Sequence, residues 1–125
     1  MPEGDAVHLA KRLFAAIEAG DVDAVAALYH PDAVVWHNTD DVEQPVELNL
    51  RVLRWLVRTL PERRYADQRL LATDTGFVSQ HVLRGTTATG DLVAIPACIV
   101  ATCADGRISR IEEYVDSAHV AHLTG

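Results

Sequence analysis

Four strand-like segments in the second half of the chain limit the folds that this sequence can adopt. They cover residues 64–73, 77–87, 92–103 and 107–116, and the breaks between them read DTG, ATGD and ADG. Short breaks that contain glycine, set between β-branched runs, are typical of hairpin turns and predict consecutive antiparallel strands. Such a sheet must bury one face, so the first half of the chain has to cover it.

The first half has the apolar spacing of helices. Apolar residues recur at helical intervals from Asp5, a suitable N-cap, to Gly20, where the run stops. Asp21 can cap a second, short helix that ends near Pro31, because proline disfavours helical backbone at the residue before it. A third helix is predicted over 45–60, and its first residue is a proline, which suits that position.

The remaining segments complete a single-domain pattern. AVVWHN at 33–38 reads as a strand and is followed by the acidic, turn-rich stretch TDDVEQP, while a short helix is expected over 117–123. These elements predict an α+β fold over residues 1–125. Three N-terminal helices should pack on a curved, mostly antiparallel sheet, with a pocket between them.

Charge and composition exclude several classes of protein. The net charge of −7 argues against nucleic acid as a partner. No apolar run approaches the ~20 residues of a membrane span, and the acidic N-terminus lacks the pattern of a secretion signal, so a cytoplasmic location is expected. Cys98 and Cys103 lie five residues apart on one strand, where their side chains would point to opposite faces. We expect neither a disulfide nor a metal site, and no cofactor.

Strand parity selects polar side chains that can share a face. Tyr114 and Asp116 form one such pair, and Ser79 and His81 form another. A carboxylate within hydrogen-bond reach of an imidazole would fix its tautomer and stabilise its charged form. We therefore expect His81 and Asp116 to meet in the pocket and to move a proton. The competing interpretations are an N-cap role for Asp116 and a core role for His81.

Three motifs, together with the order of the elements, resemble the nuclear transport factor 2-like superfamily. They are DVDAVAALYHPDAVVWHN (21–38), QHVLRGTTATGDLV (80–93) and ADGRISRIEEYVD (104–116). This superfamily includes SnoaL-like polyketide cyclases, ketosteroid isomerases and limonene epoxide hydrolases. The resemblance implies a cone-shaped half-barrel with an apolar interior, which commonly forms homodimers through the outer face of the sheet. Because some members are enzymes and others bind ligands or proteins, function has to be argued from the site.

Trp36 and Asn38 resemble an aromatic residue and an asparagine that line the pocket of the epoxide hydrolase branch, two residues apart. The resemblance implies that they bind substrate in an otherwise apolar cavity, where an indole N–H and a carboxamide each need a partner. The alternative is a core tryptophan and an asparagine that caps the end of the strand.

The remaining site positions depart from the epoxide hydrolases. Tyr114 and Asp116 resemble that branch's tyrosine and second carboxylate, but His81 and Ser79 stand where it has an acid and an arginine. The resemblance therefore favours the SnoaL-like group, in which a histidine such as His81 is common. The acid expected in cyclases after the TG turn is missing from LVAIPACIV.

The resulting expectation is a cofactor-free acid–base enzyme acting on a small, apolar carbonyl compound. His81 and Asp116 would be catalytic in an isomerisation, cyclisation or dehydration. The expected substrate-binding residues are Trp36, Asn38, Ser79 and Tyr114. One alternative is the addition of water to an epoxide through Asp116 and Asn38, and another is a non-catalytic module that binds a ligand or a protein.

Overall fold

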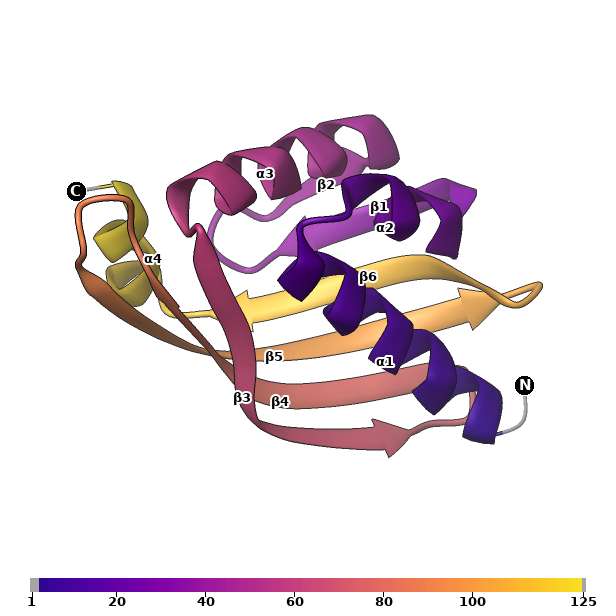
Figure 1. Cartoon of the computed structure of the whole chain (residues 1–125). Helices are drawn as coiled ribbons and strands as arrows, with labels where there is room; N and C mark the ends of the chain where they lie inside the picture. The colour runs from indigo at the N-terminus through magenta and orange to yellow at the C-terminus, as the bar shows by residue number, and fades with distance from the viewer. Residues whose placement is uncertain (1–2, 125) are drawn as a thin grey trace.

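The computed structural model describes residues 3–124 and shows a curved, open sheet with helices packed on one face (Figure 1). The helices are α1 (Glu3–Ala19), α2 (Val22–Leu28), α3 (Val46–Thr59) and α4 (Ser117–Thr124). The strands are β1 (Tyr29–His37), β2 (Val42–Pro45), β3 (Glu62–Ala72), β4 (Gly76–Thr86), β5 (Leu92–Ala104) and β6 (Arg107–Val115). The predicted α+β half-barrel is confirmed.

The sheet has the strand order β2-β1-β6-β5-β4-β3. The predicted meander of β3 to β6 is antiparallel throughout, and β1 joins it by pairing parallel to β6. Strand β2 was not predicted, because its four residues lie within the acidic, turn-rich stretch. Strand β1 also begins earlier than predicted, at Tyr29, and contains Pro31. The β1–β6 register shifts between Tyr29 and Val34, and proline is tolerated at such an irregularity because it cannot donate to the ladder.

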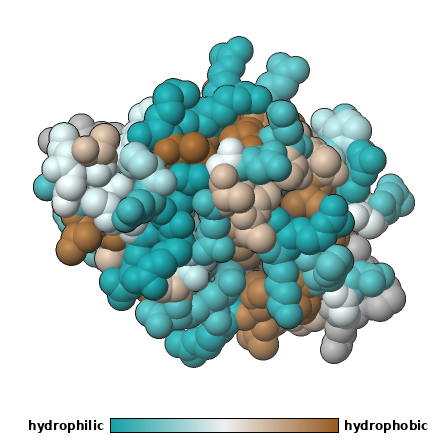
Figure 2. Space-filling model, viewed as in Figure 1, coloured by the Kyte–Doolittle hydropathy of each residue, from teal (hydrophilic) through white to brown (hydrophobic). Residues whose placement is uncertain are grey.

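The main core lies between α1 and the concave face of the sheet. Leu13 and Phe14 of α1 are almost fully buried, as are Phe77 of β4 and Ile108 of β6. Helix α2 is capped as predicted, since the Oδ1 atom of Asp21 accepts a hydrogen bond from the N–H of Ala24 at 3.0 Å. No helix within residues 3–124 is long and apolar enough to cross a membrane. From the helical side the surface is mostly hydrophilic, with apolar patches between the polar side chains (Figure 2).

An irregularity in β3 allows one of its side chains to contact β4. Its register against β4 shifts between Ala66 and Arg69, and Asp67 has a φ of 53°. A bulge of this kind bends the strand and changes the direction in which its side chains point. Here the amide of Gln68 reaches β4 and donates to Oγ of Ser79 at 3.1 Å.

Candidate active site

A cavity of about 190 Å³ lies between the concave face of the sheet and the helices. Its walls are mainly apolar side chains from α1, α3, α4 and the central strands. Seven residues with hydroxyl, amide, carboxylate or imidazole groups also line it, and they come from β1 and the turn after it, α3, β3, β4 and β6: Tyr29, His37, Thr39, Asn49, Tyr65, His81 and Glu113. Several polar groups therefore converge on one apolar space, which is the arrangement expected of a small-molecule site.

The predicted inner face is correct for β4 and wrong for β1 and β6. His81 faces the cavity, but on the other two strands the cavity is lined by His37 and Glu113. These two residues are partners in the parallel β1–β6 register, so they lie side by side on one face. Because side chains alternate along a strand, choosing the wrong face moves every side chain of that strand to the opposite side.

Trp36 and Tyr114 consequently lie on the outer side of the sheet. Their rings pack edge to face with centroids 5.3 Å apart. The indole N–H of Trp36 donates to Oδ1 of Asp41 at 2.7 Å, and Tyr114 is exposed. Neither residue lines the cavity, which corrects the prediction that they bind substrate there.

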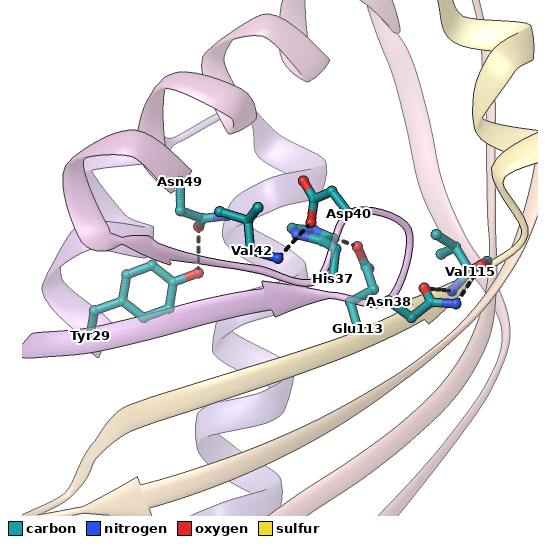
Figure 3. A network of polar contacts seen from close by, with 8 residues as sticks. All are labelled: Tyr29, His37, Asn38, Asp40, Val42, Asn49, Glu113 and Val115. Carbon is teal, nitrogen blue, oxygen red and sulfur yellow. Dashed lines mark hydrogen bonds and ion pairs between the residues drawn. The ribbon is translucent and has the colours of Figure 1, made fainter.

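Asn38 has a positioning role at the end of the β1–β6 ladder. Its Oδ1 accepts from the N–H of Val115 at 2.9 Å, and its Nδ2 donates to the carbonyl of Val115 at 3.1 Å (Figure 3). The main-chain N–H of Asn38 also donates to the carbonyl of Glu113 at 3.1 Å. Asn38 does not line the cavity, so the prediction of substrate contact is corrected. It instead holds the strand segment that presents Glu113.

Asp116 is exposed and does not line the cavity. Its Oδ1 accepts a hydrogen bond from the N–H of Ala118 at 2.8 Å, at the start of α4. Asp116 shares a shallow, open groove with Asn38, His81 and Tyr114, but of these four residues only His81 also lines the apolar cavity. The structure therefore does not bring His81 and Asp116 together inside the apolar cavity, and it supports the capping interpretation of Asp116.

The carboxylate that does face the cavity belongs to Glu113. Its Oε1 lies 3.0 Å from Nε2 of His37, and the two side chains are 26% and 19% exposed (Figure 3). The hydrogen bond that His37 donates to Glu113 raises the pKa of His37 above its ordinary value of 6.5, against the opposing effect of burial. Within residues 3–124, no donor is paired with the second oxygen of Glu113. That oxygen is therefore available to a bound molecule.

His81 is held in place by a chain of side-chain hydrogen bonds. Its Nδ1 lies 2.8 Å from Oγ of Ser79, which accepts from Gln68. When the Ser79 hydroxyl donates to Nδ1, the imidazole proton is left on Nε2. Ser79 is fully buried and does not line the cavity, so it orients His81 rather than contacting substrate as predicted.

The surroundings of His81 favour its neutral form. The ring packs edge to face against Phe14 and Tyr65, with centroid separations of 5.2 and 4.8 Å. Burial lowers the pKa of His81 below 6.5, although the charge of Glu113 acts in the opposite direction. A neutral ring with its proton on Nε2 is a hydrogen-bond donor toward the cavity.

Two tyrosines and an asparagine are also part of the polar lining. The hydroxyl of Tyr29 donates to Oδ1 of Asn49 at 2.9 Å. Burial raises the pKa of both Tyr29 and Tyr65, and the negative charge of Glu113 raises it further. Both hydroxyls therefore keep their protons at neutral pH. Within residues 3–124, no protein group pairs with the amide nitrogen of Asn49 or the hydroxyl of Tyr65. Both groups can donate to a bound molecule.

Sequence reasoning missed most of this cluster, although the sequence held signals for part of it. In IEEYVDS, the face that carries Glu113 also carries Ile111 and Val115, whereas the opposite face carries Tyr114 and Asp116. The more apolar face of a half-buried strand is normally the inner one. No comparable difference separates the two faces of AVVWHN.

The pKa values of the two cavity histidines, His37 and His81, should be shifted in opposite directions from 6.5. Stabilisation from the charged form of His37 is present below pH 6.5 and is lost as the pH rises through its raised pKa. Stabilisation from neutral His81 is present above pH 6.5 and is lost as the pH falls through its lowered pKa. Imidazole NMR titration should therefore give one pKa on each side of 6.5.

The variant Glu113→Gln should lower the pKa of both histidines, because the carboxylate raises both. The matched variant Asp116→Asn removes a carboxylate outside the cavity and should leave both values unchanged. Two histidines that titrate together near 6.5, or that ignore the loss of Glu113, would contradict this description of the site.

Comparison with known proteins supports the fold described above and assigns the chain to one family. The SnoaL-like domain matches residues 10–111, which is most of the chain. The chain is a member of the SnoaL-like family. This agrees with the resemblance found in the sequence. No significant match was found among curated proteins.

Solved structures similar to this SnoaL-like protein show the same fold at low sequence identity. A proposed polyketide cyclase from Xanthomonas campestris has a TM-score of 0.84 at 18% identity, with 98% of each chain covered. AclR, a proposed hydroxylase from Streptomyces galilaeus, has a TM-score of 0.87 at 14% identity, covering 98% of this chain and 83% of its own. An LEH-like epoxide hydrolase from M. tuberculosis has a TM-score of 0.78 at 18% identity, covering 97% and 90% respectively. At these identities the likeness concerns the fold, and the relatives differ in described activity.

Proposed function

We propose that this SnoaL-like protein is an acid–base enzyme that removes and returns a proton next to the carbonyl group of a small, apolar substrate. The observation that carries the proposal is the position of Glu113. Its carboxylate is hydrogen-bonded to His37 and faces a cavity that also contains the donors His81, Asn49 and Tyr65. A base and several donors around one apolar space are the groups that enolisation requires.

The proposed step begins at the second oxygen of Glu113. This oxygen takes a proton from the carbon beside the carbonyl, and the C–H electron pair moves to form an enolate. The enolate oxygen accepts hydrogen bonds from Nε2–H of His81 and from Asn49 or Tyr65. Glu113 then returns the proton to the same carbon or to a conjugated one, which gives exchange or isomerisation. His37 orients Glu113 throughout, and the atoms and electrons balance without a further reactant.

The experiment that tests this function is solvent deuterium exchange into cyclohexanone, followed by ¹H NMR. This ketone has acidic protons only beside its carbonyl, and its single ring is close to the size of the cavity. The protein should accelerate exchange above the buffer rate, and the acceleration should depend on Glu113. If the wild-type protein does not increase the exchange rate of ketones that it binds, the proposed function is wrong.

We also infer that the protein forms a homodimer through the outer face of the sheet. Apolar side chains remain partly or fully exposed there on four neighbouring strands: Val34, Trp36, Val78, Val82, Val100 and Tyr114. Apolar faces of this kind are typical of protein contacts. Sedimentation should show a dimer at micromolar concentration, and Val100→Asp should shift it toward monomer. A wild-type protein that sediments only as a monomer would refute this inference.

A further inference from the structure

The size and polarity of the cavity indicate which substrates it admits. We propose that the site selects a molecule of one six-membered ring, or an acyclic molecule of that size, that carries a single carbonyl oxygen. This inference deepens the proposed function, because the carbonyl is the group on which Glu113 would act. It excludes fused multi-ring compounds as substrates of the wild-type protein.

The volume is the first argument. At about 190 Å³, the cavity is only slightly larger than the ~150 Å³ apolar cavities that bind one benzene molecule. Sites for drug-sized ligands usually measure about 300–1,000 Å³. One ring with a carbonyl group fits this space, whereas a second fused ring would extend beyond it.

The walls show which side chains set the limit. Trp55 and Leu53 of α3 and Leu123 of α4 line the cavity opposite the sheet. Trp55 is the largest of them, so its indole fills space that a smaller residue would leave open. On the sheet side, the small residue Ala97 of β5 lines the cavity and lies opposite His81 in the β4–β5 register. A longer side chain at position 97 would extend into the space next to the His81 ring.

Polarity is the second argument, and it limits the substrate to one polar group. Polar or titratable side chains form only part of the cavity lining, and the rest of the wall is apolar. A carbonyl oxygen beside His81 can be satisfied by the donors there. A second polar group placed against the apolar part of the wall would lose its hydrogen bonds to water without gaining a protein partner, which weakens binding.

The test is a series of ketones with increasing ring number: cyclohexanone, 1-tetralone and anthrone. Binding is measured by ¹H–¹⁵N NMR shifts of backbone amides in β4 and β6. Cyclohexanone should bind at least about tenfold more tightly than 1-tetralone, a difference of roughly 1.4 kcal/mol, and anthrone should not shift these amides. Apolar burial alone would favour the larger ketones, so the reverse order indicates exclusion by size. Equal or tighter binding of 1-tetralone or anthrone in the cavity would overturn the proposal.

Two variants change the cavity in opposite directions. Ala97→Leu should reduce cyclohexanone binding at least tenfold, while Ala94→Leu, on the exposed outer side of the same strand, should not. Trp55→Ala should enlarge the cavity and admit 1-tetralone. Because it gains a ligand, this variant remains informative if Ala97→Leu fails to fold. A Trp55→Ala protein that folds and still excludes 1-tetralone would contradict the assignment of Trp55 as the limiting residue.

Repeating the ketone series with Glu113→Gln separates this inference from the proposed function. The variant should keep the preference for one ring, because its cavity has nearly the same size, although it should no longer exchange protons. Size selection without exchange in the wild-type protein would refute the proposed function alone. Exchange without size selection would refute the inference drawn here alone.

Discussion

Replacing Glu113 with glutamine should reduce the rate of cyclohexanone deuterium exchange by about 10²–10⁴-fold, the usual contribution of a positioned general base. The amide has nearly the shape of the carboxylate, and its oxygen can still accept the hydrogen bond from His37. It cannot, however, take a proton from carbon near neutral pH. Binding of cyclohexanone should change little, so the loss should appear in the exchange rate of the bound ketone. Rates measured at saturating ketone by ¹H NMR separate the two quantities.

The matched control for this experiment is Asp116→Asn. Asp116 is exposed and caps the start of α4, so its replacement should cost at most about 1 kcal/mol of unfolding free energy and leave exchange unchanged. Circular dichroism and thermal melting establish that both variants are folded. If Asp116→Asn abolished exchange while Glu113→Gln did not, the base would lie outside the described cavity and the proposed mechanism would be wrong.

Replacing Phe77 with alanine should produce the largest loss of stability. Phe77 is completely buried in the core between α1 and the sheet. Truncation of a buried phenylalanine usually costs about 3–5 kcal/mol, because the lost contacts leave a cavity. A domain of this size has a total unfolding free energy of roughly 5–15 kcal/mol, so the variant should be barely stable or melt at least about 10 °C lower.

Leu71→Ala is the control for Phe77, because Leu71 lies on the neighbouring strand β3 and is 63% exposed. Its replacement should change the unfolding free energy by less than about 0.5 kcal/mol. Urea denaturation followed by circular dichroism measures both variants. Similar losses for the two would show that the core does not lie where the structure places it.

Much of the fold was predictable because it depends on local signals. The spacing of apolar residues in α1 and α3, the cap at Asp21 and the glycine-containing turns each determine structure over a few residues. Strand β2 was missed because four exposed and partly exposed residues carry no periodic signal. The early start of β1 was missed because Pro31 normally argues against a strand, and only the register shift beside it makes the proline acceptable.

Local patterns in the sequence were enough to predict every element except β2, the order of those elements and, through strand parity, which side chains of one strand lie on the same face. Strand parity paired Tyr114 with Asp116 and Trp36 with Asn38. In the structure Trp36 and Tyr114 pack together on one face, while Asn38 and Asp116 follow the last residues of β1 and β6. The packing of the whole sheet makes the face that carries Trp36 and Tyr114 the outer one on β1 and β6. The physical reason is that parity is a property of one strand, whereas the inward direction depends on how the whole sheet packs on helices distant in sequence. The same packing brings His37, Glu113 and His81 to one cavity.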